Sequence, residues 1–245
     1  MLIDRYQSAV EELFAKVRNT QRENIIKAGK IVADSVANGG CIFLSGICHS
    51  IENDLIYRGG GPIFYKHFSY NLNVESASRT RDRSDLGYER QTEAAAKYAL
   101  TQSSIRPGDV LFVSSVSGRT VKVVDLAYEA EKLGVKVIAL TSMEYAVKVD
   151  PVHPSGKKLY EIATLTLDNC APAAEAMLEV DGIEARFAAA SGIASDYIMW
   201  SLTSVAVEEL LKKGITPGIL KSANYPGGND YNKTVIEPNY EKFGY

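Results

Sequence analysis

The sequence contains few cysteines, and their spacing argues against two common kinds of site. The three are Cys41, Cys48 and Cys170, and no two of them form a Cys-x-x-Cys pair. A disulfide framework or a zinc centre needs paired cysteines or a regular His/Cys spacing. The three histidines lack metal-ligand spacing as well. We therefore predict neither a structural disulfide nor an intrinsic metal site.

Long apolar runs and a strong charge of one sign are also missing. The most apolar segment, residues 197–211, is interrupted by Ser201, Thr203, Ser204 and Glu208, whereas a membrane span needs about 20 mostly apolar residues. The first residues carry acids and no signal-peptide core. A net charge of −3 favours neither nucleic acid nor an anionic membrane as a partner. We expect a cytoplasmic protein.

Nucleotide-binding fingerprints are missing too. The sequence has neither the G-x-x-x-x-G-K-[ST] pattern of a phosphate-binding loop nor the G-x-G-x-x-G pattern of a dinucleotide site. NAD is therefore not expected, and nothing in the sequence implies another cofactor.

Apolar periodicity outlines an α/β fold. Apolar residues in steps of three and four predict a helix over 3–17, and Thr20 with Glu23 has the capping-box spacing of a second helix start. Further helices are predicted at 89–103, 121–134 and 191–214, and strands at 41–45, 110–113, 135–140 and 160–169.

Strands that alternate with helices are typical of a parallel sheet covered by helices. No linker or internal repeat divides the 245 residues. We expect one domain over 1–245, with N-terminal helices over 1–38, an α/β core over 39–214 and a C-terminal tail of loops and short turns over 215–245.

The segment "SSVSGRT", residues 114–120, follows the apolar run "VLFV" and is here called the hydroxyl loop. In open parallel sheets, ligands bind beyond the carboxyl ends of the strands. The start of a helix presents free N–H groups and partial positive charge to an anion. Ser115, Ser117 and Thr120 add hydroxyl donors, and Gly118 lets the backbone approach a ligand. The alternative is that these residues only cap the helix.

The segments "RPGDVLFVSSVSGRT", "AYEAEKLGVKVIALTS" and "FLSGICHS" resemble the core of SIS (sugar isomerase) domains. Three later segments, "HPSGKKLYEIATLTLDNCAP", "ASGIASDYIMWSLTSVAVEELLKKG" and "SANYPGGNDYNK", are similar to a bacterial subgroup, the UPF0309-like proteins. The resemblance covers roughly residues 20–235. It implies a flavodoxin-like three-layer α/β sandwich, with a parallel sheet flanked by helices and an N-terminal helical extension.

The resemblance also implies a ligand and an assembly. SIS proteins bind phosphorylated sugars, and they are usually dimers or tetramers with sites near subunit interfaces. In this chain, Ser115, Ser117, Gly118 and Thr120 would hold the anionic head group, and Gly46 and Ser50 would line the sugar. The first loop departs from the family's small Gly/Ser-rich turn, because Ile47 and Cys48 intervene.

Aldose–ketose isomerisation through an enediol needs one group that moves a proton between carbons and a second that assists at the oxygens. Carboxylates and imidazoles suit both tasks, and the candidates are Glu175, Glu52, His49, His153 and Asp54. Each has an alternative interpretation: the acids can favour a helix start through the dipole, and the histidines can stabilise loops. Cys48 is interpreted as a small apolar residue rather than a nucleophile.

Two further groups of residues bear on the ligand. Arg119 lies inside the hydroxyl loop, and Arg79, Arg81 and Arg83 alternate in a polar segment. Arginine forks match phosphate, sulfonate or carboxylate, although a solvated loop is the alternative for the three alternating residues. Asn224, in the Gly-rich segment 222–233, is a candidate for contacts to sugar hydroxyls.

Together these observations predict an isomerase that acts on a sugar phosphate or sugar sulfonate. A lyase or etherase acting on an amino-sugar phosphate and a phosphosugar sensor without turnover are the alternatives. Regulators of this family usually carry a DNA-binding domain, for which the segment before the first strand is too short.

Overall fold

The structure is a computed structural model that describes residues 1–46, 52–73 and 88–245, with side chains from residue 94 onward in the last range. Its centre is a five-stranded parallel sheet in the order β2-β1-β3-β4-β5. The strands are β1 (Ile42–Ser45), β2 (Tyr65–His67), β3 (Val110–Ser114), β4 (Lys136–Thr141) and β5 (Leu165–Asp168). After β1 the chain runs to one side of the sheet and after β3 to the other, so the topological switch point lies between these two strands.

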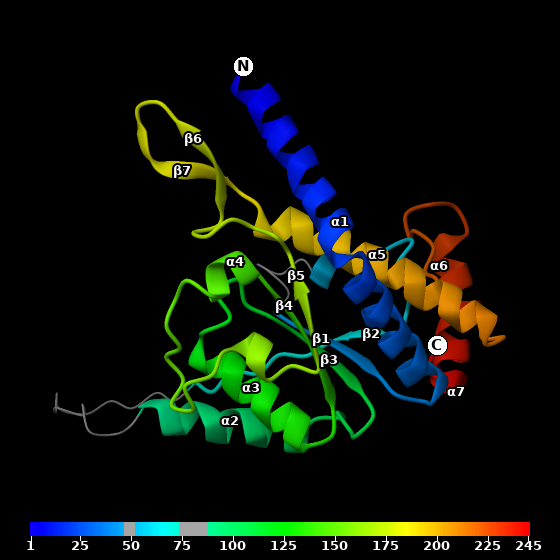
Figure 1. Cartoon of the computed structure of the whole chain (residues 1–245). Coiled ribbons are helices and arrows are strands. Elements are labelled where there is room, and N and C mark those ends of the chain that lie inside the picture. Colours follow the sequence, from blue (N-terminus) through cyan, green and yellow to red (C-terminus); the bar gives the residue numbers. More distant parts are fainter. Residues whose placement is uncertain (47–51, 74–87) are drawn as a thin grey trace.

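Helices cover both faces of the sheet (Figure 1). On one face lie α1 (Leu2–Ala37) and α5 (Ser191–Lys212), and on the other α2 (Tyr88–Gln102) and α3 (Val121–Lys132). Side chains alternate along the strands, so that Val110 and Phe112 pack with α1 and α5 whereas Leu111 and Val113 pack towards α2 and α3. The three-layer, flavodoxin-like sandwich with a parallel sheet is confirmed.

The prediction of two N-terminal helices is wrong, because α1 is continuous over 36 residues. The Thr20 hydroxyl donates to the carbonyl of Lys16 at 2.8 Å, which is a bond inside a helix rather than at its start. No glycine or proline separates 17 from 20, so nothing stops the first helix.

A second sheet of two antiparallel strands, β6 (Ala176–Val180) and β7 (Ile183–Ala189), was not predicted. The Asp181-Gly182 pair between them is a strong hairpin signal. The hairpin and the N-terminal end of α1 project together beyond the central sheet (Figure 1). The Arg5 guanidinium donates to the carbonyl of Glu179 and holds the two together.

The C-terminal tail contains more helix than expected. It folds into α6 (Gly228–Tyr231), a π-helical turn η3 (Asn232–Ile236) and α7 (Glu237–Phe243). Ile236 packs with Ile63 and Leu220 in a small apolar cluster beside the β2 edge of the molecule. Two short elements complete the chain, α4 (Met143–Ala146) and the 3₁₀ turn η2 (Leu159–Glu161). Among the described residues, no helix has the length and apolar content to cross a bilayer.

Candidate functional site

A pocket of about 430 Å³ opens at the carboxyl ends of β1, β2 and β3, beside the first turns of α3. We call it the switch-point pocket, because it lies where parallel α/β sheets bind ligands. Its polar lining consists of Ser45, Gly46, Glu52, His67, Ser69, Tyr70, Asn71, Ser114 and Lys122. Apolar residues from β3 and α3 complete the wall.

Glu52 is the buried acid of this pocket. Its side chain is 4% exposed, and its Oε1 lies 4.0 Å from Nδ1 of His67. Its Oε2 is buried and has no hydrogen-bond partner among the described residues. The backbone is fixed, since the Glu52 carbonyl accepts from the amides of the buried Leu55 and Ile56. A buried carboxylate oxygen without a partner costs free energy, so such groups concentrate at functional sites.

Lys122 brings a positive charge to the same pocket from the second residue of α3. Its Nζ donates to the carbonyl of Tyr70 at 3.0 Å and to Oδ1 of Asn71 at 3.3 Å. The ammonium also lies 4.7 Å from the centre of the Tyr70 ring. Burial, and then the charge of Asp125, raise the pKa of the Tyr70 phenol to about 12, so this hydroxyl stays protonated.

Neighbouring segments of the chain hold the backbone of the hydroxyl loop. The Ser115 amide donates to the Leu140 carbonyl at 3.1 Å, and the Thr141 hydroxyl donates to the Val116 carbonyl at 3.0 Å. The carbonyl of Gly118 accepts from the Leu159 amide at 2.8 Å. These contacts anchor the loop backbone at the start of α3 whether or not a ligand is present.

The alternative that the hydroxyls only cap the helix finds little support in the geometry. Thr120 is the N-cap residue of α3, yet its side chain makes no capping hydrogen bond. The Ser115 hydroxyl accepts from the Gly118 amide at 3.2 Å, within the loop itself. Ser117 and Arg119 are half-buried in the same loop. The loop therefore lies at the helix start, and its role as an anion site stays a prediction.

His153 lies away from the switch-point pocket. Its Nε2 is 2.8 Å from Oδ1 of the buried Asp125 on α3, and its Nδ1 is 2.7 Å from the Ser155 hydroxyl. Because a carboxylate only accepts, Nε2 carries the proton. These residues line a separate depression next to Tyr128. The contact holds the 147–158 segment against α3. This position agrees with the alternative in which His153 stabilises a loop.

Glu175 does not lie at a helix start, so the alternative that it favours such a start through the dipole is wrong. It precedes the hairpin strand β6, with a positive φ of 77°, and it accepts a hydrogen bond from the Ser191 hydroxyl at the start of α5. The chain between β5 and α5 forms a hairpin here, so Glu175 is placed at its base. Glu175 is not among the residues that line the switch-point pocket.

The other candidates fall outside this cluster. Asp54 pairs with Arg58 at the surface, and Asn224 is exposed in the loop before α6. Gly46 lies in the pocket wall, directly after β1. The remaining candidates lie outside the described residues: Cys48, His49, Ser50, Arg79, Arg81 and Arg83.

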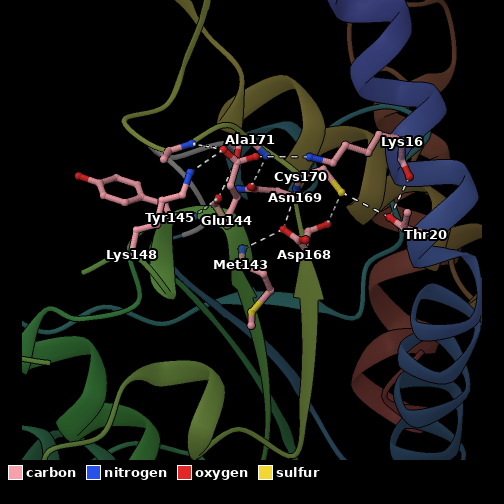
Figure 2. Close-up of polar contacts among 12 residues, drawn as sticks. Lys16, Thr20, Met143, Glu144, Tyr145, Lys148, Asp168, Asn169, Cys170 and Ala171 are labelled. Carbon is pink, nitrogen blue, oxygen red and sulfur yellow. Dashed lines mark hydrogen bonds and ion pairs between the residues drawn. The ribbon is translucent and has the colours of Figure 1, made fainter. Parts of the chain in front are cut away.

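A polar network ties the carboxyl ends of β4 and β5 to α1 (Figure 2). Oδ1 of Asp168 accepts from the amides of Met143 at 3.0 Å and Cys170 at 2.8 Å. Sγ of Cys170 lies 3.6 Å from the Thr20 hydroxyl, and burial raises the pKa of this thiol. A hydrogen bond from the Ala173 amide lowers the pKa of Glu144, which also pairs with Lys16 and Lys148. This network supports the edge of the sheet structurally.

A parallel sheet in 2-1-3-4-5 order, with a polar pocket at its switch point, defines a ligand-binding protein of the flavodoxin-like class. The family model described as "SIS domain" matches residues 5–142. A UPF0309 protein of Streptomyces avermitilis is 34% identical over 240 residues, which cover 96% of this chain and 94% of that protein. UPF0309 protein OB3413 of Oceanobacillus iheyensis is 32% identical over 98% of this chain and 97% of that protein. The chain therefore belongs to the SIS-domain family and, within it, to the UPF0309 group.

Solved structures have the same fold at low sequence identity. One is the NanR protein of Vibrio vulnificus complexed with ManNAc-6P, with a TM-score of 0.50 and 17% identity, covering 87% of this chain and 67% of that chain. Another is the phosphoheptose isomerase GmhA of Neisseria gonorrhoeae, with a TM-score of 0.50 and 14% identity, covering 85% and 98%. At these identities the likeness concerns the fold alone.

Proposed function

We propose that this protein is an aldose–ketose isomerase that acts, through an enediol, on a sugar with a terminal anionic group. The observation that carries the proposal is the buried Glu52 carboxylate, whose Oε2 lacks a partner among the described residues, in a pocket that adjoins the hydroxyl loop. A carboxylate held out of water can remove a proton from a carbon next to a carbonyl. A dry, preformed pocket favours that transfer over side reactions.

The anionic group binds at the start of α3. Ser115, Ser117, Gly118, Arg119 and Thr120 surround it, and the helix dipole favours its charge. Lys122, in the first turn of the helix and without a carboxylate partner among the described residues, adds a positive charge on the pocket side. Phosphate and sulfonate both suit these donors.

Roles in proton transfer follow from placement. Of the two candidate carbon bases, Glu52 lies in the pocket whereas Glu175 is bonded to Ser191 at the base of the hairpin, so Glu52 is favoured. An imidazole assists at the oxygens; His153 is held by Asp125 away from the pocket, and His49 lies outside the described residues. Gly46, in the pocket wall, lies close to the sugar. The reaction uses no cofactor, because both proton transfers are internal to substrate and side chains.

The assembly is a cytoplasmic homodimer or homotetramer of one SIS domain per chain, with sites near subunit interfaces. NanR, a protein of this fold, has been solved with a sugar phosphate, and another protein of the fold is named an isomerase. These names fit an anionic sugar as the small-molecule ligand.

The experiment that tests the proposal is incubation of the purified protein with sugar 6-phosphates and 6-sulfonates in deuterated water, followed by NMR. We expect aldose–ketose interconversion with deuterium incorporated next to the carbonyl. Binding without exchange would contradict the proposal and indicate a sensor. Exchange accompanied by loss of a substituent would indicate a lyase or etherase.

A further inference from the structure

We propose that His67 is the second proton carrier of this site and works as a pair with Glu52. The inference rests on the proposed isomerase function and adds a residue to it. No sequence motif marks His67, since it ends the three-residue strand β2 and owes its position to strand pairing.

The sheet brings the two residues together. His67 is paired with Leu44 of β1, and the next amide, that of Phe68, donates to the Leu44 carbonyl at 2.9 Å. The last strand residue of β2 is thereby fixed beside the carboxyl end of β1, from which the chain leads to Glu52. The side chain of Phe68 is buried, which helps to hold the end of β2 in place.

The two side chains differ in their exposure to solvent. The His67 side chain is 48% exposed, so its imidazole reaches both the pocket and solvent, whereas the Glu52 side chain is 4% exposed. Nδ1 and Oε1 lie 4.0 Å apart, beyond hydrogen-bonding distance. An ordinary surface ion pair would have both groups in water and would gain little from the contact. Here the carboxylate is buried and its other oxygen has no partner among the described residues.

The pair accounts for every proton in the reaction. The Glu52 carboxylate removes the proton from the carbon next to the carbonyl, the C–H electron pair forms the C=C bond, and protonated His67 donates to the carbonyl oxygen. In the enediol, Glu52 holds one proton and His67 is neutral. Glu52 then returns its proton to the neighbouring carbon while His67 accepts the hydroxyl proton from the oxygen that becomes the new carbonyl. Both side chains end as they began, and no oxidant or reductant is needed.

The test compares His67→Ala with Glu52→Gln on the sugar that the wild type turns over best. Removing one general acid–base group lowers kcat by about 100-fold or more. We expect that loss in His67→Ala, with KM within about threefold of wild type, as for a group that acts mainly in the transition state. Because His67 is accessible, added imidazole should restore at least about a tenth of the lost kcat in His67→Ala and none in Glu52→Gln.

Glu208→Gln, at an exposed carboxylate paired with Lys212 on α5, is the control and should leave kcat unchanged. Circular dichroism checks that each variant folds, and His67→Gln replaces His67→Ala if the smaller side chain destabilises the strand end. If both His67 variants keep kcat within about threefold of wild type, the role of His67 is overturned while the isomerase function stands. If the wild type neither exchanges deuterium nor interconverts any sugar, both proposals fail together.

Discussion

At the scale of single residues, the hydroxyl loop shows a second reason for its glycine. Gly118 was expected to let the backbone approach a ligand. Its φ of +64° lies in the left-handed region, and a Cβ there would sit 3.3 Å from Oγ1 of Thr141. Thr141 is also the donor that holds the Val116 carbonyl. Glycine is therefore needed to shape the loop, and the ligand site depends on that shape.

Gly118→Ala should lower stability and weaken substrate binding together. Forcing an L-residue into the left-handed region costs about 1 kcal/mol or more, and the contact with Thr141 adds to that. Gly214→Ala is the matched control, because Gly214 has φ +75° with open space around its Cβ and lies after α5, far along the chain from the loop. Both variants should lose stability in thermal denaturation, but only Gly118→Ala should raise KM. Equal KM values in the two variants would contradict the anion site.

Asp196 on α5 has a partly buried carboxyl group, which is an unfavourable environment for a charge. Its Oδ1 is buried without a hydrogen-bond partner among the described residues, and burial raises the pKa of its carboxyl while the charge of Arg58 opposes the shift. A carboxyl whose pKa is higher in the folded state stabilises the fold below the unfolded pKa. That contribution is lost as the pH rises through the folded pKa.

Asp196→Asn should therefore raise Tm at pH 7 slightly. The gain in the free energy of unfolding should be on the order of 1 kcal/mol or less, because the group is only partly buried. The gain should shrink as the pH falls below the carboxyl range, where the wild-type side chain is already neutral. Asp150→Asn, at an exposed position, should change Tm little at any pH. A gain from Asp196→Asn that persisted at acid pH would show that charge burial is not its cause.

At the scale of elements, close packing between α1 and α5 fixes the helical layer on one face of the sheet. A Cβ on Gly29 of α1 would lie 2.6 Å from Cβ of Val205 and 2.8 Å from the carbonyl oxygen of Leu202. The two helices therefore approach each other more closely than any larger residue allows. This contact buries the apolar face of the 36-residue helix α1 along its C-terminal half, including Ala28, Val32 and Val36.

Gly29→Ala should destabilise the protein even though alanine is the better helix former. The intrinsic gain is about 1 kcal/mol in a helix interior, whereas forcing a methyl group into a packed interface costs about 1–3 kcal/mol. Gly192→Ala, in α5 with no atom within 4 Å of the added Cβ, makes the same chemical change without the contact. Chemical denaturation should show Gly192→Ala at or above wild-type stability and Gly29→Ala below it. Equal stabilities would mean that the helices can separate at little cost.

How far the sequence predicts the elements depends on burial. The strands β3 and β4 lie in the middle of the sheet, and their unbroken apolar runs identified them. The strand β2 has only three residues, with a lysine and a histidine, and gives no periodic signal. The hairpin strand β7 is exposed at six of its seven residues, so it lacks the alternation on which strand prediction depends.

The same dependence on strand signals explains which residues of the candidate site could be predicted from the sequence. The hydroxyl loop and Glu52 follow strands that the sequence reveals, so both were identified. His67 ends a strand without a signal, and Lys122 looks like an ordinary surface residue of an amphipathic helix. Their shared pocket is created by strand order, and strand order is a non-local property that motif spacing does not carry.

At the scale of the whole molecule, the β6–β7 hairpin and the N-terminal end of α1 form a projecting surface that is suited to a protein contact. The hairpin is a two-stranded sheet with exposed apolar residues, including Ile183 at 53% and Phe187 at 50%. A pocket of about 500 Å³ lies between β7 and the first turns of α1, lined by Leu2, Ile3, Tyr6, Phe187, Ala188 and Ala189. Isolated two-stranded hairpins are marginally stable in water, and clustered exposed apolar side chains mark contact surfaces. A second copy of the chain is the occupant that fits the proposed homo-oligomer.

Phe187→Ser should shift the assembly towards smaller species, because it removes an exposed aromatic ring from the centre of this surface. Aromatic residues are enriched among the hot spots of protein interfaces, and losing a hot spot costs about 2 kcal/mol or more, which is about a 30-fold loss of affinity. Leu211→Ser, at a 54% exposed leucine near the C-terminal end of α5, is the matched control. Sedimentation velocity of the wild type should show a dimer or tetramer, with dissociation only in Phe187→Ser. A monomeric wild type, or equal dissociation of both variants, would mean that the hairpin surface is not where copies meet.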